Sequence, residues 1–308
     1  MPGTSWCLAS DETALEVACV TEMAAADFLL RCAPFFAPAS ATMQPMVTMA
    51  LRAARRAAQI IVRAMDRVDR LTIHEKQKND LVSEVDHAAE AAIIDTLRTA
   101  YPDHGFLGEE GGVVNGTSEH LWVIDPLDGT TNFLHGIPHF AVSIGLKHRN
   151  RLEAAVIIDP VRNEEFTASR GGGAHVNGRR MRVSQRHRLD EAVLATGIPF
   201  RELDRHLEPY MKMLTDFTRQ CRSIRRAGSA ALDLAYVAAG RADGFWELGL
   251  KSWDMAAGAL MIQEAGGLVG DLMGAEHFLD KGNIVAGNPK IFKAMLQTIR
   301  PHLDGELR

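Results

Sequence analysis

The sequence has little cysteine. Cys7, Cys19 and Cys32 lie in the first 45 residues, so Cys221 is alone in the rest of the 308-residue chain. A single cysteine cannot form a disulfide within residues 46–308, which excludes a disulfide-stabilised scaffold for the body of the protein. The scarcity of cysteine favours a reducing compartment, and we expect the protein to be cytoplasmic.

Long apolar runs are absent as well. No stretch of about 18 or more consecutive apolar residues occurs, which argues against a membrane-spanning helix. The body of the protein also has no large excess of positive or negative charge, because residues 46–308 carry 33 Lys and Arg against 34 Asp and Glu. This balance is not typical of a protein that holds nucleic acid by bulk charge. Hydrophobic residues make up 46% of the chain, as in ordinary globular proteins.

Residues 1–45 differ from everything after them. They hold five acidic side chains and one arginine, and no basic residue precedes their apolar stretches, so they do not resemble a secretory signal. From Met46 an amphipathic helical pattern begins. We predict that residues 1–45 are an N-terminal extension, disordered or not native, with the native start at Met43 or Met46. A short ordered appendage is the alternative.

The pattern of the body predicts two domains of α/β class. Residues 46–187 are expected to form an α+β N-terminal part, with a second helix at about Glu84–Ala100, strand-like runs and Gly-rich hairpin turns. Residues 188–308 alternate short strands with helical stretches near 205–220, 229–239 and 254–265, which predicts a second domain.

The densest chemical signal is the segment from Asp125 to Thr131, D-P-L-D-G-T-T. An apolar strand is expected to end at Asp125, because Pro126 lacks a backbone donor. Gly129 allows a close turn, and Thr130 stands where a helix with open N–H groups would begin. Two carboxylates beside such a helix start suit Mg²⁺, which takes few protein oxygens and lets phosphate complete its coordination. An Asp-rich turn with a helix cap is the alternative.

Three further segments carry acidic residues whose simplest interpretation is structural. Gly108–Gly112 places adjacent carboxylates in a Gly-rich loop, where an exposed acidic turn would be usual. Asp254 precedes a small-residue helix and would serve as its N-cap. In Asn79–Asp86, Ser83 is a candidate cap for the helix that starts at Glu84.

No residue has the signature of a covalent nucleophile. Cys221 has no motif around it, no serine lies in a nucleophile-elbow pattern, and the zinc motif H-E-x-x-H is absent. The sequence therefore offers no sign of covalent or zinc-protease chemistry.

Taken together, in their order and spacing, the acidic segments resemble the inositol monophosphatase family of lithium-sensitive, metal-dependent sugar and nucleotide phosphatases. The resemblance covers about residues 46–300 and is most similar to bacterial members. Its specific signatures are Asp125–Phe133 and Trp253–Gly258. It implies a layered αβαβα sandwich of the sugar-phosphatase type with the site between its two domains, a homodimer, and inhibition by Li⁺.

The resemblance also implies the metal ligands. Glu109, Asp125 and the main-chain carbonyl of Leu127 would hold a first Mg²⁺ ion. A second ion would lie among Asp125, Asp128 and Asp254, and a third, looser ion would involve Glu109.

Catalytic and substrate contacts follow from the same resemblance. Glu109 and Thr130 would orient the attacking water, with the Thr130 hydroxyl paired to Asp86. Phosphate would meet the amides of Gly129 and Thr130. The hydroxyls of the substrate would meet a wall formed by Gly228, Ala230, Glu247 and Asp254. For Gly228 and Ala230, close helix packing by small residues is an equal alternative.

One feature departs from the family. The position where its active-site lysine would align without a gap is Glu75, and Lys76 and Lys78 lie nearby. We therefore assign no residue to that role.

The leading prediction is hydrolysis of inositol monophosphate, a small-molecule phosphate ester, by metal-activated water. Related phosphatases that act on 3′-phosphoadenosine phosphate, fructose bisphosphate or histidinol phosphate are alternatives. A different class is a regulatory role in transcription antitermination, with RNA polymerase and antitermination factors as partners. The pair Arg225-Arg226 and the cluster Arg179–Arg188 would suit such a surface, although a solvated basic face is the commoner explanation.

Overall fold

The computed structural model describes residues 44–68, 71, 73–77, 80–303, 305 and 307. The predicted extension falls outside the described residues except for its last two positions. Lys78 and Asn79 also lie outside them, and only the backbone is described at Glu75 and Lys76. Within the described ranges, no helix is long and apolar enough to cross a membrane.

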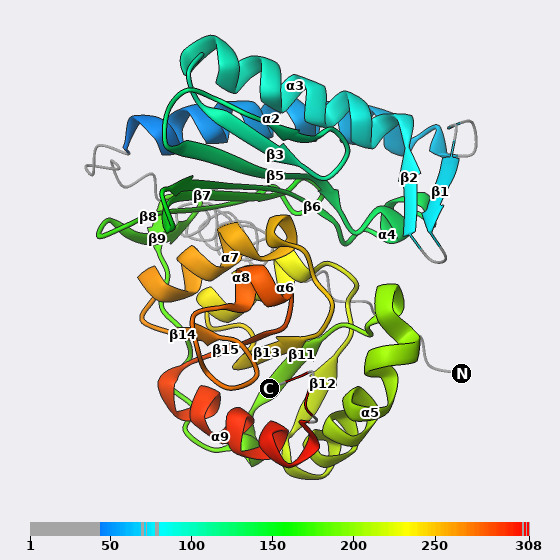
Figure 1. Cartoon of the computed structure of the whole chain (residues 1–308), viewed down its shortest axis with the longest axis vertical. Coiled ribbons are helices and arrows are strands. Elements are labelled where there is room, and N and C mark those ends of the chain that lie inside the picture. The colour runs from blue at the N-terminus through cyan, green and yellow to red at the C-terminus, as the bar shows by residue number, and fades with distance from the viewer. Residues whose placement is uncertain are drawn as a thin grey trace, which may run out of the picture. The chain divides into compact units, whose positions relative to one another are not determined.

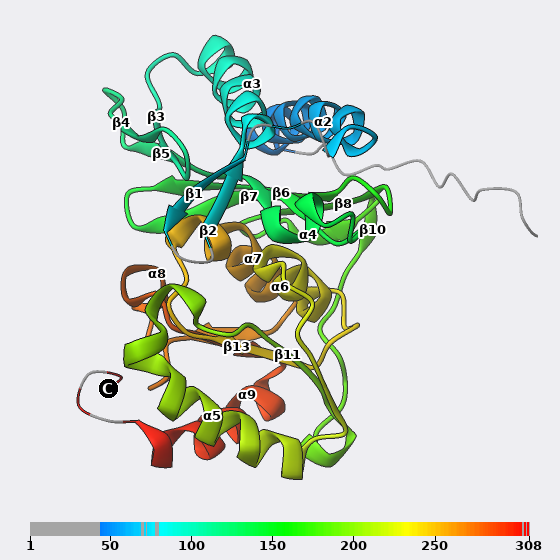
Figure 2. The ribbon, with the colours of Figure 1, turned by 90° about the vertical axis from the view of Figure 1, so that its right-hand side faces the viewer.

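The described part of the chain forms five layers that alternate helices and sheets (Figures 1 and 2). Two helices lie on the outer face of an eight-stranded sheet, two more lie between this sheet and a five-stranded sheet, and the last two cover the far face of the smaller sheet. The predicted αβαβα class is confirmed. In the same order, the helices are α2 (Pro45–Met65), α3 (Glu84–Ala100), α6 (Ala230–Ala238), α7 (Ser252–Glu264), α5 (Leu203–Gln220) and α9 (Pro289–Ile299).

The larger sheet has the order β10-β9-β8-β7-β6-β5-β3-β4. All its neighbouring strands are antiparallel except β3 and β5, and the hairpin turns predicted at Gly171–Gly173 and Asn177–Gly178 join β8, β9 and β10. Its strands are β3 (Gly105–Gly108), β4 (Gly112–Val114), β5 (His120–Asp128), β6 (Ala141–His148), β7 (Arg151–Asp159), β8 (Glu164–Ser169), β9 (Gly173–Val176) and β10 (Arg179–Arg180).

The smaller sheet has the order β12-β11-β13-β15-β14, with β11 parallel to both of its neighbours. Its strands are β11 (Val193–Thr196), β12 (Ser223–Arg225), β13 (Gly244–Glu247), β14 (Leu268–Gly270) and β15 (Ile284–Gly287). The remaining elements are short: a hairpin of β1 (Ile73–Gln77) and β2 (Asp80–Ser83), helices α4 (Thr130–Leu134) and α8 (Phe278–Lys281), and the 3₁₀ turns Leu189–Glu191, Phe200–Glu202 and Arg300–His302.

Side-chain alternation along the smaller sheet explains the layering. Phe245 and Ala195 point to a core shared with α6 and α7, whereas Trp246 and Leu194, their chain neighbours, point to the core under α5 and α9. Both faces of the strands are therefore apolar, as expected of a sheet that is covered on both sides.

Helix α7 lies between the two sheets, and its composition reflects this. It is rich in alanine and apolar around its whole circumference, and all residues from Asp254 to Ile262 are buried. A helix without a polar face must be enclosed on all sides. The small side chains let both sheets approach the helix closely.

Two local predictions are wrong. Strand β5 does not end at Asp125 but continues to Asp128, because the ladder with β6 is bulged between these residues and so accommodates Pro126 without a donor. Asp254 is not an N-cap. It is the third residue of α7, where its carboxylate accepts a hydrogen bond of 2.7 Å from the backbone N–H of Lys251, the residue before the helix.

The close contact between α6 and α7 gives a test of the fold. A Cβ atom on Gly258 would lie 2.4 Å from the Cβ of Leu234, so Gly258→Ala forces the two helices apart. The gain in helix propensity is about 1 kcal/mol and the cost of overpacking is about 1–3 kcal/mol. We expect a net loss of stability in urea unfolding. Gln263→Ala, on an exposed part of the same helix, is the control and should stay within about 0.5 kcal/mol of the wild type. A Gly258→Ala protein as stable as the wild type would contradict the packing.

Candidate functional site

One cavity of about 560 Å³ brings the predicted site residues together. All of them line it except Asp86, which lies behind Thr130. They come from segments far apart in the chain: the end of β3, the end of β5 with α4, the start of α6, the end of β13 and the first turn of α7. The lining residues among them are Glu109, Asp125, Leu127, Asp128, Gly129, Thr130, Gly228, Ala230, Glu247 and Asp254.

Parallel pairing of β3 and β5 places Glu109 beside Asp125. Gly108 is in register with Ile124, and the Glu109 N–H donates to the Ile124 carbonyl at 3.2 Å. Glu109 and Asp125 are the residues that follow this paired position on the two strands, so they lie side by side although 16 positions separate them in the sequence. Asp125 is 1% exposed, and one of its oxygens accepts from the Leu127 N–H at 3.0 Å.

Asp128 connects β5 to helix α6. Its Oδ2 accepts hydrogen bonds from the Ser229 hydroxyl at 2.6 Å and from the Ala231 N–H at 2.7 Å. Ser229 is the N-cap of α6, so the carboxylate lies at the positive end of that helix. This contact bridges about 100 residues of sequence.

Asp254 reaches the same cavity from the middle layer. The Trp253 carbonyl accepts a hydrogen bond of 3.4 Å from the hydroxyl of Ser143, which is the cross-strand partner of Asp125. The first turn of α7 is thereby held against the strands that carry the other acids. Asp254 is buried, with 4% of its surface exposed.

The expected pairing of Thr130 with Asp86 is present. The Thr130 hydroxyl lies 2.9 Å from Asp86 Oδ1 and also 2.9 Å from the Leu127 carbonyl oxygen. Ser83 caps α3 as predicted, and its N–H and hydroxyl both donate to Asp86 Oδ2. Asp86 is thus engaged by three donor groups, and the single Thr130 proton is donated within the protein, to Asp86 or to the Leu127 carbonyl.

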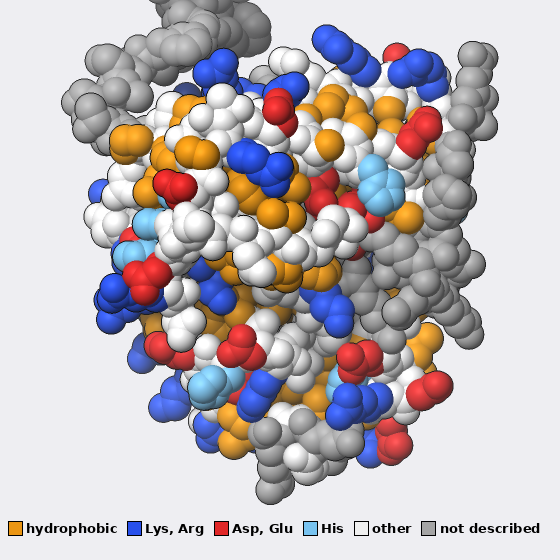
Figure 3. Space-filling model, turned by 45° about the horizontal axis from the view of Figure 1, so that its top comes forward, with side chains coloured by type: hydrophobic (Ala, Val, Ile, Leu, Met, Phe, Trp, Pro, Cys, Tyr) orange, Lys and Arg blue, Asp and Glu red, His pale blue; other side chains and the backbone are white. Residues whose placement is uncertain are grey.

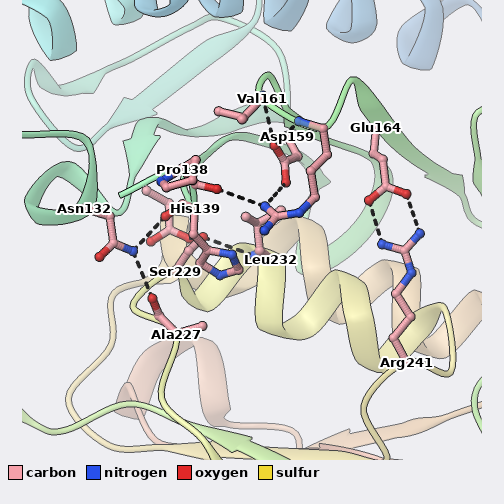
Figure 4. A network of polar contacts seen from close by, with 12 residues as sticks. Asn132, Pro138, His139, Asp159, Val161, Glu164, Ala227, Ser229, Leu232 and Arg241 are labelled. Atoms are coloured by element: carbon pink, nitrogen blue, oxygen red, sulfur yellow. Dashed lines mark hydrogen bonds and ion pairs between the residues drawn. The ribbon is translucent and has the colours of Figure 1, made fainter. Parts of the chain in front are cut away.

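The loop after α4 is fixed by the Asn132 side chain. Its amide nitrogen donates to the carbonyls of His139 and Ala227, at 2.7 and 2.9 Å (Figure 4). Nearby, Arg162 joins the Pro138 carbonyl to the buried Asp159. The Asn132 contact with Ala227 holds α4 against the loop that leads into α6. The role of Asn132 as a link between the two halves of the site was not predicted.

Among the cavity residues that were not predicted as site residues are Phe200, Arg226 and Asp233. The Arg226 guanidinium lies over the Phe200 ring, 5.2 Å from its centroid. Asp233 is 4% exposed, on an otherwise apolar helix. A single carboxylate within the run A-A-L-D-L-A was the available signal, because a buried charge without a structural partner is costly.

The acids repel one another. Burial, followed by the charge of Asp254, raises the pKa of Asp128 to about 7. Desolvation and neighbouring carboxylates also raise the pKa of Glu247 and of Asp233 well above their ordinary values. The cavity thus gathers acids whose charged forms are disfavoured by burial and by one another, a condition typical of functional sites.

The donor set fits a hard divalent cation whose coordination is completed from outside the protein. Within the part of the chain that the structure describes, no three His, Cys, Asp or Glu side chains form a cage that could hold a metal ion alone. Mg²⁺ does not need such a cage, because it binds one or two carboxylates and keeps water and phosphate oxygens as its other ligands. Carboxylates around a cavity of this size, with mutual repulsion that a cation would relieve, match those requirements.

Side chains of both predicted basic segments are exposed. Arg225, on the edge strand β12, and Arg226 both face solvent, and Arg226 also lines the cavity. In the cluster, Arg186 pairs with the buried Asp243 and Arg188 with Asp190. On the face shown in Figure 3, Lys and Arg side chains are interspersed with Asp and Glu.

Comparison with known proteins identifies similar chains. Residues 42–303 match the model of the inositol monophosphatase family. The Nus factor SuhB of Pseudomonas aeruginosa is 59% identical over 271 residues, which are 86% of this chain and all of that protein. The crystal structure of the extragenic suppressor protein SuhB from Bartonella henselae is 45% identical, with a TM-score of 0.81 over 84% of this chain and 99% of that one. An inositol monophosphatase from Anabaena is 34% identical, with a TM-score of 0.75 over 85% and 97%.

The raised pKa of Asp128 predicts how stability depends on pH without metal. The folded-state pKa of about 7 exceeds the ordinary value of 3.8. Protonation therefore favours the folded form: this stabilisation is complete below about pH 4 and is lost as the pH rises through about 7. In EDTA, the unfolding free energy of the wild type should fall by at least about 1 kcal/mol between pH 5 and pH 8.

Asp128→Asn provides the matched comparison, because the amide keeps an acceptor for Ser229 and has no charge to lose. Its stability should depend less on pH over the same range in urea titrations. Equal slopes for the two proteins would show that Asp128 is ionised across the whole range.

Proposed function

The chain belongs to the inositol monophosphatase family, and on that premise we propose that it is a Mg²⁺-dependent phosphomonoesterase that hydrolyses inositol monophosphate to inositol and phosphate. The observation that carries the proposal is the convergence of Glu109, Asp125, Asp128 and Asp254 on one cavity. Four acids from three separate segments line the same space, where burying a carboxylate is costly unless its charge is compensated, and a divalent cation would supply that compensation.

In this proposal, Glu109, Asp125 and the Leu127 carbonyl hold one Mg²⁺, and Asp125, Asp128 and Asp254 hold a second, with Glu109 involved in a third. When bound, such ions polarise phosphoryl oxygens and lower the pKa of water toward neutrality. The burial of Asp125 and Asp254 strengthens their electrostatic interactions, because the surrounding dielectric is low.

The protein's own groups orient the attacking water. The single Thr130 proton is shared between Asp86 and Leu127, so the Thr130 oxygen faces the cavity as an acceptor. A water that donates one hydrogen bond to Thr130 and one to Glu109 presents a lone pair to phosphorus. Because no serine or cysteine nucleophile takes part, water attacks phosphorus directly.

Phosphate binding is assigned to the amides of Gly129 and Thr130. Gly129 adopts a positive φ of 93°, which only glycine reaches without strain. A Cβ atom there would lie 3.1 Å from the Gly228 and His139 carbonyl oxygens. The turn into α4 is therefore as tight as the surrounding chain allows, and this lets a ligand approach the backbone.

The leaving alcohol is assigned to the wall formed by Gly228, Ala230, Glu247 and Asp254. Carboxylate acceptors suit a polyol with several hydroxyl donors. On family grounds we further propose inhibition by Li⁺ and a homodimer in solution. The related substrates 3′-phosphoadenosine phosphate, fructose bisphosphate and histidinol phosphate are the alternatives that a substrate panel must separate.

A second function is favoured by a specific observation. The P. aeruginosa relative, identical at 59% of positions, is named a Nus factor. We propose that this chain also takes part in transcription antitermination with RNA polymerase and antitermination factors, through surfaces outside the cavity.

The metal assignment is tested by Asp125→Asn. Loss of a ligand shared by both proposed ions should lower kcat by at least about 100-fold, while the metal-free protein keeps its Tm, because one of several repelling charges is removed. Phosphate release is measured on the substrate panel with Mg²⁺, and with Mg²⁺ plus Li⁺. Asp95→Asn, on the exposed side of α3, is the control. A kcat within threefold of the wild type would refute the assignment, and a tenfold preference for a 3′-phosphonucleotide would change the substrate.

The same variant separates the two functions. In a deletion strain, Asp125→Asn should restore growth phenotypes that depend on antitermination, because the substitution lies inside the cavity. It should not restore phenotypes that depend on phosphate release. Failure to restore any phenotype, at normal protein levels, would argue against a separate regulatory function.

A further inference from the structure

Glu90, on the face of α3 that points to the site, contacts the loop that carries Glu109. Its side chain is buried, with 4% of the residue exposed. Its Oε2 accepts the Glu110 N–H at 2.9 Å and its Oε1 accepts the Gly111 N–H at 2.6 Å. Both oxygens of one carboxylate thus hold successive amides immediately after Glu109.

The glycines of this loop are matched to that carboxylate. A Cβ atom on Gly108 would lie 2.4 Å from Glu90 Oε2, and one on Gly111 would lie 2.8 Å from Oε1. Neither distance is sterically possible. Gly108 and Gly111 therefore leave the space that the Glu90 carboxylate fills, on either side of Glu109 and Glu110.

The side chains of the two glutamates in the loop, Glu109 and Glu110, point to different places. The Glu109 side chain lines the cavity. The Glu110 carboxylate instead approaches His87 on α3, with 3.9 Å between Oε2 and Nδ1. Fixing the amides on the far side of Glu109 therefore limits how the loop turns and which carboxylate faces the cavity.

Asp86 and Glu90 are one helical turn apart on α3, so they lie on the same face. Asp86 accepts from Thr130, and Glu90 holds the loop that carries Glu109. One turn of a single helix thus sets the relative position of the two groups to which water orientation is assigned.

We propose that Glu90 is a positioning residue that acts through Glu109. The expected effect on kcat rests on the proposed function, whereas the expected effect on Mg²⁺ binding does not require that the protein cleaves an ester. A charged acceptor gives stronger hydrogen bonds to backbone amides than a neutral one. Replacing one oxygen by an NH₂ group leaves one loop amide facing a donor, which frees the loop and hence Glu109.

The experiment compares Glu90→Gln with Glu264→Gln. Glu264 makes the same kind of contact at a distant place, because its two oxygens accept the Gly171 and Gly173 amides of a glycine turn at 2.8 and 2.9 Å. It does not line the cavity. Both substitutions should lower the Tm of the metal-free protein. Glu264→Gln therefore shows how far the loss of such a contact changes stability without affecting the site.

Three quantities are measured: the metal-free Tm, the Mg²⁺ concentration that half-saturates the Mg²⁺-induced rise in Tm, and kcat and KM for phosphate release. For Glu90→Gln we expect the half-saturating Mg²⁺ concentration to rise at least fivefold and kcat to fall at least tenfold, with KM within threefold, because the substrate wall is untouched. Glu264→Gln should leave all but the metal-free Tm within twofold of the wild type.

Gly111→Ala is the second variant, since it keeps the charge but displaces the carboxylate, and it should reproduce the Mg²⁺ and kcat effects if Glu90→Gln does not fold. The inference is overturned if the folded variants keep both quantities within twofold of the wild type. A wild type that binds Mg²⁺ but cleaves no ester would refute the proposed function, while the Tm titration would still decide the role of Glu90. A wild type with no Mg²⁺-induced shift overturns both.

Discussion

The structure depends on the confinement of several carboxylates in one poorly solvated space. Burial, and then the charges of neighbouring carboxylates, raise the pKa of Asp128, Glu247 and Asp233, and such a cluster opposes folding unless other contacts offset it. The fold offsets it with three apolar cores: one between the larger sheet and helices α2 and α3, one around α6 and α7 between the two sheets, and one between the smaller sheet and helices α5 and α9. The middle layer matters most, because α6 and α7 each bring one side of the cavity to the strands of the larger sheet.

The acids are held mainly by backbone amides and hydroxyls. Asp128 accepts from the start of α6, Asp254 from Lys251, and Glu90 from the loop after β3. Arginine partners are used outside the cavity, both at the surface, as in the bidentate pair of Arg55 with Glu165, and for buried acids, as in the pair of Arg186 with Asp243. This difference has a physical consequence. An amide orients a carboxylate and stabilises its charge without cancelling that charge.

Local signals predicted the elements well where the chain itself determines them. The capping residue Ser83 and the helical spacing of apolar residues predicted a helix at Glu84–Ala100, and α3 has these bounds in the structure. Pro126 was misjudged, because whether proline ends a strand depends on the neighbouring strand, and here β6 tolerates a bulge. Asp254 was misplaced by three residues, since the helix starts earlier on a segment without a strong capping residue. Both errors concern pairing or boundaries that tertiary context decides.

The site was predictable only as far as its residues carry a motif. The signatures around Asp125 and Asp254 identified the cavity acids, but nothing in the sequence joins Glu90 to Gly111, or Asn132 to Ala227. Those contacts span 21 and 95 positions, and the residues involved have ordinary structural uses when each is taken alone. What reveals their role is geometry: a glycine that leaves space for one particular carboxylate, or an amide that meets two carbonyls from different layers. Supporting residues of this kind determine how accurately the acids are placed, and accuracy of about half an ångström decides whether such a site works.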